Sequence, residues 1–568
     1  MKLSEYKNTQ HHTLLPVLLL WAVPLLLIVP NIWLDITEPY TVAEKAVNAL
    51  LPLGIYFLIM SFWRRNAIAA LCLIPAMILA AFQIVLLFLY GESIIAIDMF
   101  LNVLTTNVHE ATELLRNLGI AIITVLVLYL PVIVLSIIAV CRHCRLSEHE
   151  RHAGLVTGTT ITLTGIVTLI VALCGSQGYN ASRKLFPLNV SCNMFSAAER
   201  FEAAKNYYTA SEDYTFNATS APTDSIPPVF VLVIGETSRA DNWQLNGYDR
   251  PTNPCLSRRD GIVSFSRALS ESNTTHKSVP LLMSALDCED FADSIFCVRG
   301  IIDTFAEAGY STVWLSNQRR NNSLIDFFGS RARSHRFLTD DGNRHFDMEL
   351  VTHLKSAIDS TCSRPVFAVL HTYGSHFNYK ERYPAEYAYF LPEPSAEAEA
   401  ANRDGLINAY DNTILYTDAV LDSIMNTLEA TGRPAALLYL ADHGEDIFDD
   451  NRHRFLHASP TPTYWQIHVP MVLWINCAMR QTRHGLYETA LANRNRNVSS
   501  SRSAFHTLVS LAGVNTPQLK PDASLVSKSY REPRRVYLND YNEAVTLEES
   551  GLKKQDFEML EKHGISAK

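Results

Sequence analysis

Five long apolar stretches in the first 176 residues constrain the fold of this chain most strongly. They cover about residues 13–34, 45–63, 67–90, 119–141 and 154–176. Each has close to the ~20 residues that a helix needs to cross the hydrocarbon core of a bilayer. The first stretch is too long for a signal peptide, lacks a small-residue cleavage site and is followed by four more. The sequence therefore predicts an N-terminal all-α transmembrane domain of five helices over residues 1–176.

The charges of the loops predict the orientation of this domain. Acidic residues such as Asp35 and Glu92 crowd the first and third loops. Basic residues precede the first stretch and occupy the second and fourth loops: Lys2, Lys7, Arg64, Arg65, Arg142, Arg145 and Arg151. Because cytoplasmic loops carry the excess of Lys and Arg, the N-terminus is expected in the cytoplasm. An odd number of spans then places everything after residue 176 outside the inner (cell) membrane, as part of a multi-pass membrane protein.

The remainder of the chain is more polar and alternates strand-like with helix-like segments. Residues 177–228 are predicted to form a bridging helix and a Thr/Ser/Pro-rich linker. Residues 229–568 are predicted to form a periplasmic α/β domain. The net charge is −9, and no block of Lys or Arg suggests a nucleic-acid surface, so we expect no nucleic-acid partner.

The run Val229–Ile234 predicts a fully buried central strand that ends at Glu236. Three later apolar runs end in the same way, at Asn317, at His371 and at Asp442 with His443. Open α/β sheets keep their ligands at the carboxyl ends of their strands. These side chains are therefore expected to line one polar pocket.

Two carboxylates and an imidazole, from Glu236, Asp442 and His443, form a ligand set suited to Zn²⁺. One acidic residue at a strand end is as often a helix N-cap, but three such ligands together favour a metal. The Ser/Thr cluster around Thr275 supplies candidate nucleophiles, because zinc lowers the pKa of a coordinated hydroxyl and a helix N-terminus can hold phosphate oxygens. Taken alone, such a cluster is more often a capping segment. We interpret the pocket as a zinc-dependent phosphoryl-transfer site.

Histidines and cysteines add further expectations. His371 is expected to be structural, whereas His376 and His457 lie in polar loops and could bind a second metal, hold phosphate oxygens or protonate a leaving group. Six cysteines follow the membrane domain and allow 15 disulfide connectivities. Cys288 and Cys297 are close in sequence and are the expected pair.

In the third loop, Asn102, Thr106 and Glu110 recur every four residues, so a helix would align them on one face. That face is either the solvated side of an interfacial helix or a site for a lipid head group.

Taken together, these motifs resemble those of the bacterial phosphoethanolamine transferases that modify lipid A and the lipopolysaccharide core, including the polymyxin-resistance enzymes. The resemblance rests on Gly235–Asn242, Asn246–Tyr248, Thr252–Pro254, Thr275 with Pro280, Gly374–His376 and Asp442–Glu445. It implies five membrane spans, a bridging segment and a C-terminal periplasmic domain of the alkaline phosphatase/sulfatase fold.

The resemblance also implies the roles of individual residues. Thr275 would be the nucleophile that is phosphorylated, and the zinc shell would comprise Glu236, Thr275, Asp442 and His443. His376 and His457 would be accessory metal or substrate histidines. Asn102, Thr106 and Glu110 would lie on the helix that binds the lipid head group.

The implied reaction transfers phosphoethanolamine from phosphatidylethanolamine to a lipid A phosphate or a lipopolysaccharide-core sugar, through a phosphorylated threonine. The sequence leaves open a periplasmic glycan or protein as the acceptor. It also leaves open a glycerol-phosphate transferase of the same superfamily and a non-catalytic membrane scaffold. Two departures from the family pattern bear on the acceptor: Asn273 and Leu281 replace cysteines of close relatives, and Gln318–Asn322 lacks a lysine for which Arg319 or Arg320 could substitute.

Overall fold

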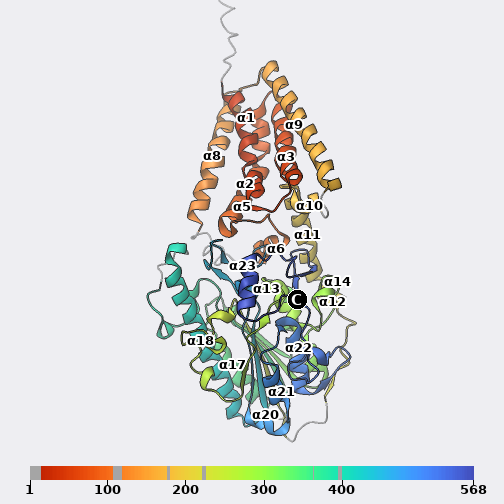
Figure 1. Cartoon of the computed structure of the whole chain (residues 1–568), viewed down its shortest axis with the longest axis vertical. Helices are drawn as coiled ribbons and strands as arrows, with labels where there is room; N and C mark the ends of the chain where they lie inside the picture. The colour runs from red at the N-terminus through yellow and green to blue at the C-terminus, as the bar shows by residue number, and fades with distance from the viewer. Residues whose placement is uncertain (1–13, 106–117, 176–178, 221–225, 362–363, 394–398) are drawn as a thin grey trace, which may run out of the picture. The chain divides into compact units, whose positions relative to one another are not determined.

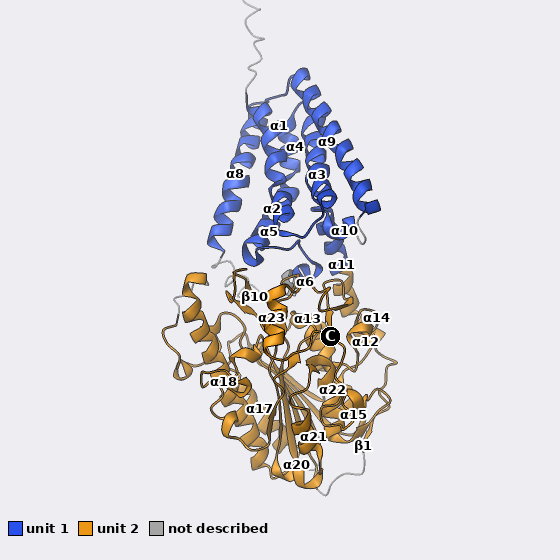
Figure 2. Ribbon diagram, viewed as in Figure 1, with its two compact units in different colours: residues 1–100, 109–197 blue, residues 101–108, 198–568 orange. Residues whose placement is uncertain are grey.

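The computed structural model describes residues 14–105, 118–175, 179–220, 226–361, 364–393 and 399–568 (Figure 1). Two compact units divide the chain (Figure 2). Unit 1 comprises residues 1–100 and 109–197, and unit 2 comprises residues 101–108 and 198–568. The domain boundaries expected after residues 176 and 228 stay a prediction.

Unit 1 is built from apolar helices. Among the described residues, four stretches of helix are long and apolar enough to cross a membrane: Leu14–Thr37 (α1, Leu14–Leu27, with α2, Val29–Thr37), α3 (Val42–Phe62), α8 (Gly119–Cys141) and α9 (Glu148–Gly175). A fifth candidate is the pair α4 (Asn66–Cys72) and α5 (Ile74–Tyr90), whose axes differ by 49°. Pro75 lies at the start of α5 and has no N–H to donate to the preceding turn, which explains the break. The predicted helical membrane domain is confirmed, with its third span bent.

Small residues bring α3 and α9 close together. A Cβ on Gly158 would lie 2.9 Å from the backbone nitrogen of Leu58, and one on Gly165 would lie 2.8 Å from the backbone of Leu51. Helices that pack in a membrane commonly use small residues in this way.

A seven-stranded sheet organises unit 2, in the order β3-β11-β8-β2-β7-β5-β6. Its bounds are β3 Ile262–Ser264, β11 Met471–Ile475, β8 Ala435–Ala441, β2 Val229–Gly235, β7 Val366–His371, β5 Ser311–Ser316 and β6 Ser334–Phe337. β2 is parallel to both β7 and β8, with Ile234 opposite His371 and Gly235 opposite Ala441. The carboxyl ends of these strands therefore meet at one edge, as the apolar runs predicted.

Helices cover both faces of the sheet, so β2 is buried on both sides. Val231 and Val233 pack in one core cluster with residues of α17 (Met348–Asp359) and α18 (Arg403–Ala430). Leu232 and Ile234 pack in another with α15 (Ile301–Glu307) and α22 (Ser500–Ala512). Figure 1 shows α17 and α18 on one side of the sheet and α22 on the other. Alternate residues of a strand point to opposite faces, which is why one continuous apolar run serves both clusters.

The cysteines differ from expectation. Cys288 is buried, Cys297 is exposed, and both thiols are free. The predicted Cys288–Cys297 disulfide is therefore wrong. Cys362 lies outside the described residues.

Candidate metal centre at the edge of the sheet

Three elements deliver the candidate ligands to one place. Glu236 directly follows β2, Asp442 and His443 directly follow β8, and Thr275 is the first residue of α13 (Thr275–Met283). Gly374 makes room beside Glu236, because its φ is +53° and a Cβ there would lie 2.7 Å from the Glu236 carbonyl oxygen.

The side chains of these four residues converge. The Thr275 hydroxyl oxygen lies 3.1 Å from His443 Nε2 and 3.4 Å from Glu236 Oε1. His443 Nε2 in turn lies 3.2 Å from Asp442 Oδ2 and 3.6 Å from Glu236 Oε1. The structure thus brings together all four residues that were predicted to form the zinc shell.

Neighbouring hydrogen bonds orient His443 and Asp442 toward the centre of this cluster. His443 Nδ1 lies 2.9 Å from the Gly444 carbonyl oxygen, which can only accept, so Nδ1 carries the proton and the lone pair of Nε2 faces the cluster. Asp442 Oδ1 accepts the N–H groups of Thr237 and His443. Asp442 Oδ2 is buried and has no hydrogen-bond partner among the described residues. A lone imidazole nitrogen beside an unpartnered carboxylate oxygen fits a bound cation.

Burial shifts the pKa of every ionisable member of the cluster. Burial raises the pKa of Glu236, and the charge of Asp442 raises it further. Burial raises the pKa of Asp442 to about 7 and lowers the pKa of His443. The two buried carboxylates of Glu236 and Asp442 oppose each other's ionisation, because like charges repel. A divalent cation would supply the missing positive charge, so the donor set fits a metal.

His457 also belongs to this cluster. The candidate ligand atoms of Glu236, His443 and His457 all lie within 4.8 Å of one another. The His457 ring centroid lies 4.3 Å from that of His443 and 5.6 Å from that of His376. His457 Nδ1 lies 3.5 Å from Glu445 Oε2. His457 is therefore placed to hold a metal, which is one of the roles that the sequence suggested for it, beside holding phosphate oxygens and protonating a leaving group.

Gln318 is a member of the site that the sequence reasoning missed. Its side-chain N–H group donates to Glu236 Oε2 at 2.9 Å and to the Thr372 carbonyl oxygen at 2.9 Å. Gln318 lies two residues beyond β5, at the same sheet edge as Glu236. The rule that identified Glu236 could have identified Gln318.

Two polar residues expected at the pocket serve the fold instead. Asn317 donates its amide to Asp347 Oδ1 at 2.8 Å. His371 is buried against Trp314, and burial lowers its pKa to about 3. His371 is therefore structural, as expected, and Asn317 does not join the cluster.

Two of the three residues expected to bind a lipid head group lie outside the described residues. Asn102 lies in α6 (Ile97–Thr105), but its side chain is not described. Thr106 and Glu110 lie outside the described residues.

Known proteins share this architecture. The integral membrane lipooligosaccharide phosphoethanolamine transferase A (EptA) of Neisseria meningitidis superposes with a TM-score of 0.70 over 92% of this chain and 99% of its own, at 22% identity. The periplasmic domain of EcEptC from Escherichia coli, solved as a complex with Zn, superposes with a TM-score of 0.53 over 60% of this chain and 98% of its own, at 23% identity. At these identities the likeness shows the fold.

The sequence comparisons identify the family. Phosphoethanolamine transferase EptA of Escherichia coli K12 is 32% identical over 297 residues, which cover 50% of this chain and 53% of that protein. The chain thus spans about half the length of the curated relatives that it matches. A sequence model described as Sulfatase matches residues 228–514. The family resemblance of the motifs is confirmed, and the chain belongs to the sulfatase family.

Proposed function

We propose that this protein transfers phosphoethanolamine from phosphatidylethanolamine to a lipid A phosphate or a lipopolysaccharide-core sugar, through a phosphorylated Thr275. The observation that carries the proposal is the position of the Thr275 hydroxyl, 3.1 Å from His443 Nε2 and 3.4 Å from Glu236 Oε1. Similarity to a protein named phosphoethanolamine transferase supports the choice of the transferred group.

Zinc is the proposed cofactor, held by Glu236, Asp442, His443 and the Thr275 oxygen, with His457 and His376 available for a second ion. When bound, Zn²⁺ would lower the pKa of the Thr275 hydroxyl and stabilise charge on the phosphoryl oxygens. The Zn complex of the EcEptC domain, which has the same fold, supports the choice of metal.

The reaction would proceed in two displacements at phosphorus. In the first, the Thr275 oxygen forms a bond to phosphorus, and the bond from phosphorus to the diacylglycerol oxygen breaks. The proton lost by Thr275 ends on diacylglycerol, with His376 or His457 assisting its transfer. In the second, an acceptor oxygen attacks phosphorus, the bond from phosphorus to the Thr275 oxygen breaks, and the proton that the acceptor loses ends on Thr275. Each displacement inverts phosphorus, so the overall reaction proceeds with retention of configuration.

The apolar helices would hold this chemistry at the inner membrane, with the sheet-containing unit in the periplasm. Donor and acceptor are both lipids in this proposal, so a membrane anchor keeps the site close to both. Asn102, Thr106 and Glu110 would bind the donor head group. The added ethanolamine amine would reduce the attraction of the cell surface for cationic peptides such as polymyxin.

Mass spectrometry of lipid A and core oligosaccharide tests the proposal. Cells that express the wild-type protein should gain a phosphoethanolamine group that cells expressing Thr275→Ala lack. The fraction that carries the addition identifies the acceptor. Glycerol phosphate in place of phosphoethanolamine would refute the proposed donor, and inversion with a chiral donor would refute the two-step reaction.

A further inference from the structure

Asn273 lies two residues before the proposed nucleophile Thr275, and the proposed chemistry gives it no role. It is also one of the positions at which the sequence departs from the family pattern. Asn273 is 3% exposed, so its polar atoms depend on partners within the protein.

Both ends of the Asn273 amide are hydrogen-bonded. Its Nδ2 donates to the Ser459 carbonyl oxygen at 2.8 Å and to Gln466 Oε1 at 2.7 Å. Its Oδ1 accepts from the Tyr537 hydroxyl at 2.7 Å. The backbone carbonyl oxygen of Asn273 accepts a fourth hydrogen bond, from the Ala458 N–H at 3.2 Å.

Two of these four hydrogen bonds reach the loop that bears His457. Ala458 and Ser459 are the first and second residues after His457. Asn273 and Ser459 are 186 residues apart in the chain. Asn273 therefore joins the segment that leads to Thr275 to the segment that leaves His457.

The backbone on either side of His457 depends on such support. Leu456 and Ala458 have φ angles of +68° and +59°, in the left-handed region that residues other than glycine rarely adopt. A backbone of this kind persists only where the surrounding structure holds it. Asn273 binds the Ala458 side directly. Gln466, its partner, donates from Nε2 to the Leu456 carbonyl oxygen at 3.2 Å and so binds the other side.

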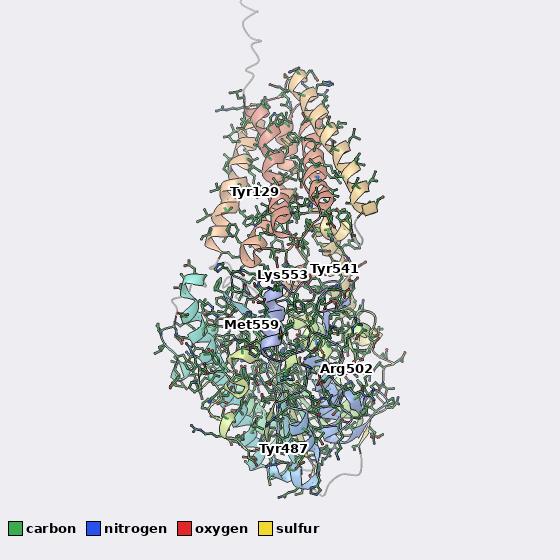
Figure 3. All side chains as sticks on the ribbon, in the orientation of Figure 1. Tyr129, Tyr487, Arg502, Tyr541, Lys553 and Met559 are labelled. Atoms are coloured by element: carbon green, nitrogen blue, oxygen red, sulfur yellow. The ribbon has the colours of Figure 1, made fainter. Side chains whose placement is uncertain are left out.

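Tyr537 fixes the orientation of the Asn273 amide. It belongs to β14 (Val536–Leu538), and Figure 3 labels Tyr541, which follows this strand in the chain. Turning the amide over would break the hydrogen bond from Tyr537 and would set the amide oxygen against the Ser459 carbonyl oxygen, which can only accept. The amide nitrogen therefore stays directed at the His457 loop.

We propose that Asn273 is a positioning residue that holds His457 beside Thr275 and thereby raises the affinity of the centre for a metal ion that uses His457. The candidate ligand atom of His457 lies within 4.8 Å of those of Glu236 and His443, and the left-handed backbone puts it there. The metal half of this inference rests on the proposed function, and the position of the loop does not.

Hydrogen exchange of the full-length protein in detergent, with chelator present, tests the position of the loop without a metal. Asn273→Ala removes three side-chain hydrogen bonds, so the amides of residues 453–461 should exchange about tenfold faster than in the wild type. Equal exchange in the two proteins would overturn the proposal.

Asn476→Ala is the matched control. Asn476 is 6% exposed, and its side chain also makes three hydrogen bonds, one of them with Ala435, the first residue of β8. Asp442 follows the other end of that strand. Asn476→Ala should therefore leave exchange in residues 453–461 within about twofold of the wild type. An equal increase in both variants would show a general loss of stability and would refute a specific role for Asn273.

Zinc affinity, measured by competition with a chelator, tests the role at the centre. His457→Ala identifies the zinc-binding step to which His457 contributes. Asn273→Ala should weaken the same step about 10–100-fold, as loss of an outer partner of a metal ligand does. Added to His457→Ala, it should change the affinity less than about twofold, because the residue that it positions is gone. Equal weakening in both backgrounds would show that Asn273 does not act through His457.

Tyr537→Phe tests the same connection and leaves Asn273 in place, should Asn273→Ala not fold. It removes one donor, so exchange in residues 453–461 should be about twofold faster or more. Tyr530→Phe is its control, because Tyr530 is also 3% exposed and donates to a carbonyl oxygen, that of Asn497, at 2.7 Å. Equal exchange in the two tyrosine variants would contradict the proposal.

The two measurements separate this inference from the proposed function. If the wild-type protein binds no zinc, the proposed metal-dependent function fails, and hydrogen exchange still shows whether Asn273 holds the loop. If the wild type binds zinc and His457→Ala binds it equally well, His457 is not a ligand and the metal half of the inference is refuted.

Discussion

Unit 2 contains two clusters, each with an aspartate, a histidine and a hydroxyl group. The pKa of the aspartate is raised in one cluster and lowered in the other. At the candidate metal centre, Asp442 lies 3.2 Å from His443, and one buried Asp442 oxygen accepts no hydrogen bond from the part of the chain that the structure describes. In the second cluster, Asp241 lies 2.7 Å from His468, and Tyr464 donates to its other oxygen.

Burial raises the pKa of Asp442 to about 7. It would also raise that of Asp241, but His468 and its neighbours lower the pKa of Asp241 to about 2. The difference shows that an Asp–His pair alone does not make a metal site. What matters is whether the surrounding protein already supplies the partners, because a cluster that lacks them gains most from a cation.

The largest expected effect is on the rate of diacylglycerol release when the hydroxyl group of one cluster or the other is removed. Thr275 lies 3.1 Å from His443, and Tyr464 lies 2.7 Å from His468. Thr275→Ala should reduce release of diacylglycerol from phosphatidylethanolamine by at least about 10³-fold, because it removes the nucleophile. Tyr464→Phe should keep the rate within about twofold, because transfer does not use this cluster. Similar losses in both variants, at equal zinc content, would break the distinction between the clusters.

A smaller effect is expected at Gln318, which fixes the orientation of Glu236 through a 2.9 Å hydrogen bond. Gln318→Met removes the donor while keeping a side chain of similar length. Loss of such an outer partner typically weakens metal binding about 10–100-fold. Competition with a zinc chelator measures the affinity, and Gln481→Met at the surface is the control. Unchanged zinc affinity in Gln318→Met would show that the hydrogen bond from Gln318 to Glu236 does not contribute to metal binding.

The comparison predicts a difference in how stability responds to metal. Asp241→Asn should cost about 1.5–3 kcal/mol with and without zinc, because it removes charge-assisted hydrogen bonds inside the protein. Asp442→Asn should lower Tm in the zinc-loaded protein and should not lower it in the chelated protein, because no described residue donates a hydrogen bond to Asp442 Oδ2. Thermal unfolding at one scan rate, with zinc or with chelator, measures both. A lower Tm for Asp442→Asn in the chelated protein would show that the Asp442 carboxylate stabilises the fold without a metal.

The smallest effect, expressed per pH unit, concerns His371, a buried histidine outside both clusters. Burial lowers its pKa to about 3, below the ~6.5 of an unfolded chain. The unfolded state therefore takes up this proton first as the pH falls. The stability contribution is complete above about pH 6.5 and is lost toward pH 3, with a slope of at most about 1.4 kcal/mol per pH unit. Between pH 6.5 and 4, unfolding of His371→Asn should take up about one proton fewer than unfolding of the wild type. The free energy of unfolding of the variant should therefore change less steeply with pH. An unchanged slope would show that His371 is charged in the folded protein.

Much of the candidate centre could be predicted because its ligands follow continuous apolar runs. Glu236 follows β2 and Asp442 follows β8, and neighbouring parallel strands bring their carboxyl ends to the same edge. The membrane helices were predictable for a similar reason, since length and apolarity are read directly from the sequence. Both features depend on local pattern.

Features that depend on distant contacts were missed or mistaken. Asp241 and His468 are 227 residues apart, and Gln318 reaches Glu236 across 82 residues. The Cys288–Cys297 pair was predicted from closeness in sequence, but disulfides require a particular geometry between two side chains. One of these thiols is buried and the other exposed.

The sequence by itself determined the apolar helices, the central strands and the carboxylates that end them, because each follows from hydropathy and periodicity along a short stretch. The tertiary structure decided which of those carboxylates keep an unpartnered oxygen. Packing gives Asp241 a tyrosine and two histidines, whereas no described residue donates a hydrogen bond to one oxygen of Asp442. The cost of burying a charge depends on every neighbour in space, so it can be assigned only when the fold has brought those neighbours together.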